Sequence, residues 1–315
     1  MALDPTLDSM LDAMRAADRP GFAAMTVEQA RVGMPASRQP EVADVRDDEI
    51  PGPAGPIPVR VYRAAPDTTG PAAVYLHGGG FVIGDLDSHD TPCRQLANAM
   101  GATVVAVDYR RAPEHSFPAA PDDAYAALTW VLEHGAEWGI DTDAVGVIGD
   151  SAGGNLATVA CLTARDRATP LPAYQILVYP NTDYDESWPS IGSRGTGYMV
   201  TYEDMKWFWG HYVEDPEHFQ HHYMSPMKAE SLAGMPPALV VTAEYDFLRD
   251  EGEAYARRLA EDGVLTTHSR YPTMAHGFIH MGALIAEANH LITEIADAAR
   301  RLVALRAATA ERATS

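Results

Sequence analysis

The chain of 315 residues contains two cysteines and no long hydrophobic run. Cys93 and Cys161 are far apart and neither belongs to a C-x-x-C pair, so the sequence offers no cysteine-based metal or redox motif. Each lies in a segment with a helical pattern, where a thiol serves as a small buried apolar side chain. No stretch of 18 apolar residues occurs, and the sequence therefore predicts no transmembrane helix.

Basic residues are also scarce, because 23 Lys and Arg stand against 44 Asp and Glu, which gives a formal net charge of −21. A surface this acidic repels phosphate backbones and anionic lipids, so we expect neither nucleic acid nor a membrane surface as partner. The simplest role of the charge is to keep the protein in solution. The first twenty residues contain four Asp and no apolar stretch, unlike a signal peptide, and we expect a cytoplasmic protein.

From residue 72 onward, apolar strand-like segments alternate with helix-like segments. The predicted strands are 72–77, 102–109, 144–150, 174–180, 237–246 and 267–272, and the predicted helices are 91–100, 122–135, 155–167, 251–262 and 284–307. Apolar strands that alternate with helices form a mostly parallel sheet covered on both faces. The sequence therefore predicts an α/β fold.

Two segments depart from this alternation. Before it, an amphipathic helix is expected over 4–17, and Thr26 with Gln29 has the spacing of a capping box that opens a second helix. Two strands joined by the turn PGPAGP are expected within 42–63. Later, residues 185–223 are rich in Trp, Tyr, Gly and His without a strand pattern, and an insertion of that length indicates a lid or cap.

The stretch GVIGDSAGGNLATVA places Ser151 between a predicted strand and a predicted helix. It fits the pattern G-x-S-x-G, which in this context forms the nucleophile elbow of α/β hydrolases. The serine backbone in such a turn is strained, so the flanking residues must be small, and Gly149 and Gly153 meet that need. The hydroxyl would then project at the carboxyl edge of the sheet, above the amino end of a helix whose dipole favours negative charge.

The segment LHGGGFVIGD follows the first of the alternating strands. An oxyanion needs N–H donors at about 3 Å, and residues without side chains allow the backbone to come that close. We therefore expect Gly79 and Gly80 to supply oxyanion-hole donors, with the N–H of Ala152 as the third. Gly78 is interpreted as shaping the turn and His77 as anchoring the loop.

A serine nucleophile needs a histidine base, and His276 is the first candidate among twelve histidines because it lies in the loop PTMAHGFIH after a strand-like segment. His280 is the second candidate. His268 alternates within a strand, as a structural residue would, and His290 lies in the long C-terminal helix. The histidines of the predicted cap are His211, His218, His221 and His222. No carboxylate or cysteine spacing accompanies that cluster, so no metal site is predicted.

The acid that orients the base is expected between the serine and the histidine in the chain. Asp246 ends an apolar strand, at the sheet edge where residues that face a ligand belong. Glu244, two residues earlier, is a minor alternative. Asp250 begins the next predicted helix and is interpreted as its N-cap.

Taken together, these motifs resemble the bacterial hormone-sensitive-lipase-like branch of the α/β hydrolases. The resemblance extends over about residues 70–280. It rests on HGGG from His77, DYRRAPEHSFPAAPDDA from Asp108, GDSAGGNLA from Gly149, EYDFLRD from Glu244 and AHGF from Ala275. One departure is Arg111, at a position where the family pattern has Leu.

The resemblance implies a mostly parallel eight-stranded sheet flanked by helices, together with a helical cap. The catalytic core would comprise 46–184 and 224–315, and the cap would comprise 1–45 and 185–223. It also implies hydrolysis of carboxylic esters, usually with short acyl chains, without a metal or organic cofactor. A homodimer is a possible assembly in this family.

The family pattern gives Ser151 the role of nucleophile, Asp246 that of acid and His276 that of base, whereas Glu114 and His115 belong to the framework. Amide hydrolysis or deacetylation by the same triad stays open. The family also resembles plant hormone receptors that have lost the catalytic histidine, and the presence of His276 argues against such a binding protein here.

Overall fold

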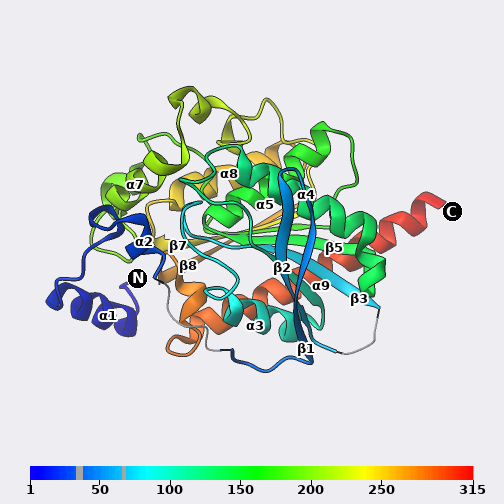
Figure 1. Ribbon diagram of the computed structural model, residues 1–315, viewed down its shortest axis with the longest axis horizontal. Helices are drawn as coiled ribbons and strands as arrows, with labels where there is room; N and C mark the ends of the chain where they lie inside the picture. The colour runs from blue at the N-terminus through cyan, green and yellow to red at the C-terminus, as the bar shows by residue number, and fades with distance from the viewer. Residues whose placement is uncertain (33–37, 66–68, 315) are drawn as a thin grey trace.

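A computed structural model describes residues 1–32, 38–65 and 69–314, with side chains described up to residue 308. Its described part forms one eight-stranded sheet in the order β1-β2-β4-β3-β5-β6-β7-β8 (Figure 1). The strands are β1 Asp44–Gly52, β2 Gly55–Arg63, β3 Gly70–Leu76, β4 Thr103–Val107, β5 Ile140–Asp150, β6 Gln175–Val178, β7 Ala238–Tyr245 and β8 Thr266–Ala275. The pairs β1–β2 and β2–β4 are antiparallel and all other pairs are parallel, which confirms the predicted α/β class.

Helices cover both faces of the sheet. The longer ones are α1 Pro5–Ala16, α3 Asp90–Met100, α4 Ala119–His134, α5 Ala152–Asp166, α7 Tyr202–Tyr212, α8 Arg249–Glu261 and α9 Ala286–Thr314. The shorter ones are η1 Phe22–Ala24, α2 Val27–Ala30, η2 Gly135–Trp138, α6 Pro189–Arg194, η3 Pro216–Gln220, η4 Pro226–Lys228 and η5 Phe278–Met281. Helices α4, α5 and α8 pack on one face, and α3 and α9 pack on the other (Figure 1).

The central strands are largely apolar because both of their faces are covered, although β4 begins with Thr103 and β6 with Gln175. Every residue of β3 from Ala72 onward, and every residue of β4 and β6, is buried. A strand that is buried on both sides has no solvent face to fill with polar residues, so the two-residue alternation disappears. The edge strand β1 carries Asp and Glu side chains, which discourage pairing with another chain.

Several sequence predictions are confirmed, with shifted ends. Strands β1 and β2 form the expected hairpin, and Thr26 with Gln29 forms the expected capping box at α2. Strand β8 extends beyond the predicted residue 272 to Ala275. Helix α5 starts at Ala152 rather than 155, and Gly153 in its first turn lies against the backbone of β3.

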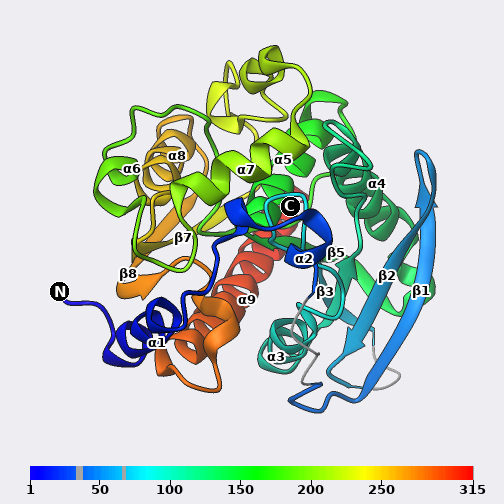
Figure 2. The same cartoon turned by 60° about the vertical axis from the view of Figure 1, so that its left-hand side comes forward.

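The segments 1–32 and 185–223 lie beside one another at one edge of the sheet, where α2 and α7 are neighbours in both ribbon views (Figure 2). The ring of Phe22, in η1, lies 5.2 Å from that of Phe208, in α7. The carboxylate of Asp204 accepts a hydrogen bond from the N–H of Ala23 at 2.9 Å. The predicted cap also contains residues 33–37, and the predicted core contains 66–68 and 315, which lie outside the described residues.

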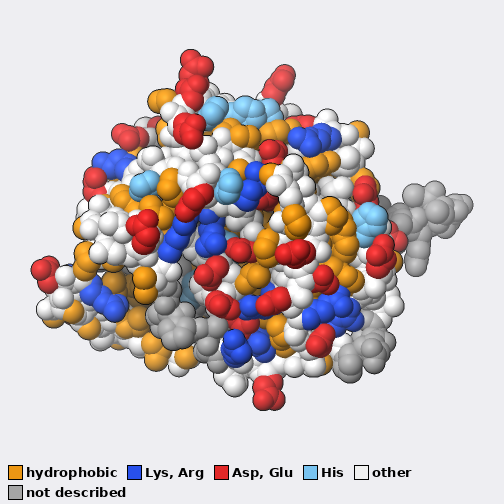
Figure 3. Space-filling model, viewed as in Figure 1, with side chains coloured by type: hydrophobic (Ala, Val, Ile, Leu, Met, Phe, Trp, Pro, Cys, Tyr) orange, Lys and Arg blue, Asp and Glu red, His pale blue; other side chains and the backbone are white. Residues whose placement is uncertain are grey.

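The acidic side chains are spread across the visible face with Lys and Arg side chains between them (Figure 3). Within the described residues, no helix is both long enough and apolar enough to cross a bilayer.

Helix α5 approaches the sheet so closely that Gly153 has no room for a side chain. A methyl group there would overlap the carbonyl oxygen of Leu76 in β3. The Gly153→Ala variant is therefore expected to lose about 2 kcal/mol or more of unfolding free energy, because backbone rather than a flexible side chain must move.

The matched control is Gly210→Ala, in α7, where a methyl group would meet nothing within 4 Å. This change is expected to be neutral or to stabilise by about 0.5–1 kcal/mol, the helix preference of Ala over Gly. Urea unfolding monitored by circular dichroism measures both. Equal unfolding free energies of the two variants would contradict the close approach of helix α5 to strand β3.

Candidate active site

Ser151 lies in a sharp turn between the end of β5 and the start of α5. Its backbone has φ 57° and ψ −121°, a left-handed conformation that is costly for a residue with a side chain. The turn is held by the Ser151 N–H, which donates to the carbonyl of Val178 at 2.9 Å. A methyl group at Gly149 would overlap the carbonyl of Gly153, so the small residues on both sides are a steric requirement.

Three residues far apart in the sequence meet at this turn. Nε2 of His276 lies 2.8 Å from the hydroxyl oxygen of Ser151, and Nδ1 of His276 lies 2.7 Å from Oδ2 of Asp246. Asp246 follows β7 and His276 follows β8, so the carboxyl ends of parallel strands bring both side chains to one sheet edge. The N–H of Leu248 donates to the other carboxylate oxygen of Asp246 at 2.9 Å and fixes its orientation.

The environment of His276 favours a protonated ring. Burial disfavours the charged form, but the charge and the hydrogen bond of Asp246 outweigh it and raise the pKa of His276 above its ordinary value of 6.5. Asp246 itself is almost fully buried, at 1 % exposure. The pair can therefore accept a proton from the Ser151 hydroxyl and hold it as an imidazolium beside a carboxylate.

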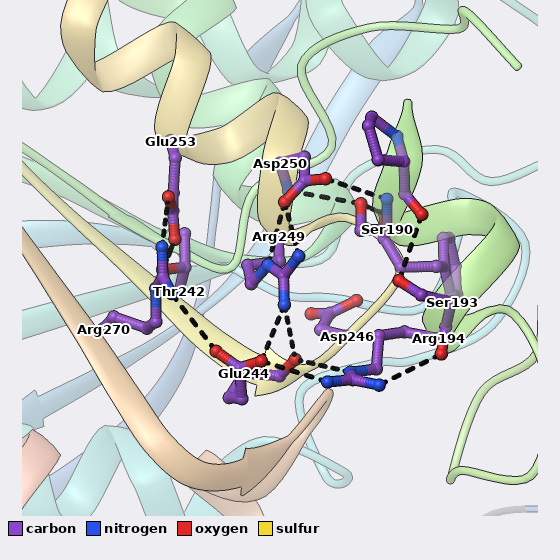
Figure 4. A network of polar contacts seen from close by, with 12 residues as sticks. Ser190, Ser193, Arg194, Thr242, Glu244, Asp246, Arg249, Asp250, Glu253 and Arg270 are labelled. Carbon is purple, nitrogen blue, oxygen red and sulfur yellow. Dashed lines mark hydrogen bonds and ion pairs between the residues drawn. The ribbon is translucent and has the colours of Figure 1, made fainter. Parts of the chain in front are cut away.

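Glu244, the alternative acid, points into a separate ionic network. Its carboxylate contacts the guanidinium groups of Arg249 at 2.7 Å and of Arg194 and Arg270 at 3.2 Å each (Figure 4). Burial alone would raise the pKa of Glu244, but these three arginines lower it. Glu244 therefore serves as a counter-ion and does not contact His276.

The prediction that Asp250 caps helix α8 is wrong. The helix begins at Arg249 with Leu248 as its N-cap. Asp250 lies in the first turn, where its carboxylate accepts a hydrogen bond from the N–H of Ser190 in α6 at 2.8 Å (Figure 4). The aspartate thus ties the 185–223 segment to helix α8, a long-range contact that local capping patterns do not reveal.

The glycine loop after β3 lines the same cavity as Ser151. Gly79 and Gly80 both have positive φ, at 125° and 59°. A methyl group at Gly79 would overlap the carbonyl of Ile83, and one at Gly80 would overlap the ring of Phe208. Within the described residues, neither of these two N–H groups donates to a protein acceptor. They are available to a negatively charged oxygen near Ser151.

His77 anchors the loop, as predicted, and Gly78, which was predicted to shape the turn, is tied to Asp150. The His77 ring stacks on Tyr109 with centroids 4.2 Å apart, and the His77 carbonyl accepts the Tyr109 hydroxyl at 2.7 Å. Burial lowers the pKa of His77 to about 3, so the ring is neutral. The N–H of Gly78 donates to Asp150 at 3.0 Å.

A cavity of about 420 Å³ opens above Ser151 and His276. The apolar part of its lining comes mainly from the predicted cap and from the end of β7. These residues are Phe22, Val200, Met205, Phe208 and Phe247. The cavity is therefore an apolar chamber with its polar groups gathered around the serine, the usual arrangement of a small-molecule site.

Sequence reasoning missed Arg31, which ties the N-terminal segment to the loops that follow β3 and β4. Its guanidinium donates to the carbonyls of Val82 at 2.8 Å and Ala112 at 2.7 Å, and pairs with Glu114 at 2.7 Å. Glu114 therefore acts as a framework residue, as predicted, by pairing with an arginine more than eighty positions earlier in the chain. The only indication in the sequence was the framework residue Glu114, for which no cationic partner was predicted.

Sequence reasoning also missed His89, and it did not connect His280 with Asp150. Among the described residues, the side chains of these three form the one group of His, Cys, Asp or Glu close enough to hold a metal ion. The four cap histidines form no such group; His221 and His222 stack on each other with centroids 4.9 Å apart. Cys93 and Cys161 are free, buried thiols, as expected.

Comparison with known proteins places this geometry in a family. The model of an alpha/beta hydrolase fold family matches residues 73–280. The carboxylic ester hydrolase LipN of Mycobacterium tuberculosis is 41% identical over 309 residues, which cover 93% of this chain and 82% of LipN. An ethyl acetate hydrolase of Pseudomonas putida is 40% identical over 246 residues, covering 77% of each chain.

The fold of this chain is also similar to that of a solved structure. The hyperthermophilic esterase of the archaeon Pyrobaculum calidifontis superimposes with a TM-score of 0.90 at 41% identity, covering 96% of this chain and 99% of that one. This chain therefore belongs to the hormone-sensitive-lipase-like α/β hydrolases, a family of serine ester hydrolases.

Proposed function

We propose that the protein is a carboxylesterase that hydrolyses short-to-medium acyl esters through an acyl-enzyme on Ser151. The observation that carries this is the continuous hydrogen-bonded chain from Ser151 through His276 to Asp246, with links of 2.8 and 2.7 Å. A hydroxyl is a weak nucleophile unless a base within hydrogen-bonding distance removes its proton. The intact base also argues against a binding protein on the same scaffold.

In the first half of the reaction, His276 takes the hydroxyl proton as Ser151 attacks the ester carbonyl. The N–H groups of Gly79, Gly80 and Ala152 stabilise the negative oxygen that develops. Loss of one such donor raises the activation barrier by about 3 kcal/mol. His276 then returns the proton to the leaving alcohol. In the second half, water attacks the acyl-enzyme with the same base, and Asp246 stabilises the imidazolium in both halves. No step needs a metal or an organic cofactor.

We further propose that the segments 1–45 and 185–223 act as one cap that sets which esters enter. The contacts of Phe22 with Phe208 and of Asp204 with Ala23 support this, since they join the two segments directly. A core of 46–184 and 224–315 would then carry all the proposed catalytic residues. The limited cavity of about 420 Å³ suits small acyl groups. The cytoplasmic location and the homodimer stay predictions.

The Ser151→Ala variant is expected to lose hydrolysis of p-nitrophenyl esters, by on the order of 10³-fold or more, because the nucleophile is removed. The wild type is expected to prefer acyl chains of about four to six carbons over long ones, given a cavity of about 420 Å³. Turnover of an acetate-to-dodecanoate series measures both. Full activity in a variant with an unchanged circular dichroism spectrum would refute the role of Ser151.

The pH dependence of kcat/KM should report the His276 pair. A protonated His276 cannot act as base, so activity is expected to fall as pH drops through the raised pKa of His276, above 6.5. Asp246→Asn removes the charge that raises this pKa. It is expected to lower kcat by on the order of 10³-fold and to move the acidic limb to lower pH.

Glu244→Gln is the matched control, because it removes a carboxylate from the same strand end without touching His276. Its acidic limb is expected to coincide with that of the wild type. A shift in Glu244→Gln with none in Asp246→Asn would reverse the assignment of the acid.

A further inference from the structure

The cavity contains a second group of ionisable side chains, which take no chemical step in the proposed hydrolysis. It consists of His89, which precedes α3, Asp150, which ends β5, and His280, in η5. One nitrogen from each histidine and a carboxylate oxygen all lie within 4.8 Å of one another. All three residues line the cavity that contains Ser151.

Asp150 is a buried carboxylate without a permanently charged partner. It is 2 % exposed, and its Oδ1 accepts hydrogen bonds from the Tyr75 hydroxyl at 2.8 Å and the Gly78 N–H at 3.0 Å. Within the described part of the chain, no Lys or Arg pairs with it; its ionic contacts are Nε2 of His89 at 3.4 Å and Nε2 of His280 at 3.8 Å. A buried carboxylate is stabilised by a nearby positive charge, which protonated histidines or a bound metal ion can supply here.

The tautomer of His89 determines whether the ring nitrogen that faces Asp150 carries a proton. The single proton of the Ser88 hydroxyl is donated to the carbonyl of Asp85 at 2.9 Å. Nδ1 of His89 lies 2.9 Å from that same hydroxyl oxygen, and in the tautomer that carries the ring proton on Nδ1 it donates to this oxygen. In the neutral ring the lone pair is then on Nε2, which is buried and has no hydrogen-bond partner among the described residues.

In that tautomer the Nε2 lone pair faces the Asp150 carboxylate at 3.4 Å, and a cation between the two groups would interact favourably with both. We propose that His89 Nε2, His280 Nε2 and the Asp150 carboxylate bind a divalent transition-metal ion of the Zn²⁺ type. Imidazole and carboxylate are the ligands such ions prefer. The Ser88 contact at Nδ1 of His89 is the outer hydrogen bond that metal-binding histidines usually make.

The site requires only a small adjustment. Zinc–ligand bonds are about 2.0–2.2 Å, so ligand atoms as far as 4.8 Å apart must move slightly together. His280 can supply this movement because about a third of its side chain, 34 %, is exposed to solvent. Three protein ligands leave a further coordination position on the side of the cavity.

A bound ion would inhibit the hydrolysis proposed above. The negative charge of Asp150 helps to raise the pKa of His276, and a cation on Asp150 would cancel that help when the imidazolium forms. The ion would also occupy space beside Ser151. The inhibition rests on the proposed function, but binding of the ion does not, so binding is the decisive readout.

Isothermal titration of the metal-free protein with Zn²⁺ tests the proposal, and the visible absorption of Co²⁺ reports nitrogen ligands independently of activity. The wild type is expected to bind one equivalent, and His280→Asn to bind at least tenfold more weakly, about 1.4 kcal/mol. His89→Gln serves as a second variant should His280→Asn fail to fold. His222→Asn is the matched control. Like His280, His222 lies close to an aspartate, Asp166 at 3.6 Å, and to another histidine, but it lies in the predicted cap.

The proposal predicts that His222→Asn binds as the wild type does. No binding by the wild type would overturn it and would mean that a proton, not a metal, lies between His89 and Asp150. Binding that survives in His280→Asn but is lost in His222→Asn or His276→Asn would equally overturn it, by placing the ion on the cap or on the proposed triad. An inactive wild type that still binds Zn²⁺ in a His280-dependent way would refute the proposed function alone.

Discussion

The close approach of helix α5 to the sheet at Gly149 and Gly153 is the constraint on which the site depends. With side chains at these positions, the helix could not start directly after β5, and Ser151 could not occupy its left-handed turn. The turn presents the serine hydroxyl to His276 and the helix amino end to the cavity. The strain at one residue is thus balanced by the packing of a whole helix on two buried strands.

The parallel sheet does the remaining positioning. Because β3, β5, β7 and β8 end at one edge, the loops that follow them carry the glycine donors, the serine, the aspartate and the histidine to a common point. Each of these groups needs only a short, local loop. The pKa of His276 is then set by one buried carboxylate that is held by a backbone N–H, with a smaller contribution from the charge of Asp150.

The sequence allowed prediction of the parts that depend on local pattern. Apolar strands such as β4 and β6, the G-x-S-x-G turn and the strand-end positions of Asp246 and His276 all follow from short-range periodicity and spacing. What it did not reveal depends on contacts distant in the chain. Arg31 reaches Glu114, Asp250 reaches Ser190 and His89 reaches Asp150, and no local pattern announces such pairs. Helix starts were also misplaced where tertiary packing overrides propensity, as at Ala152.

The proposed hydrolysis requires Ser151 to be a nucleophile activated by His276. Reaction with a fluorophosphonate, followed by peptide mass spectrometry, is the decisive measurement, because the probe forms a bond only with an activated hydroxyl. A single adduct on Ser151 is expected in the wild type, and its loss is expected in a folded His276→Asn variant. A folded wild type that is not labelled, or that is labelled on another residue, would contradict it.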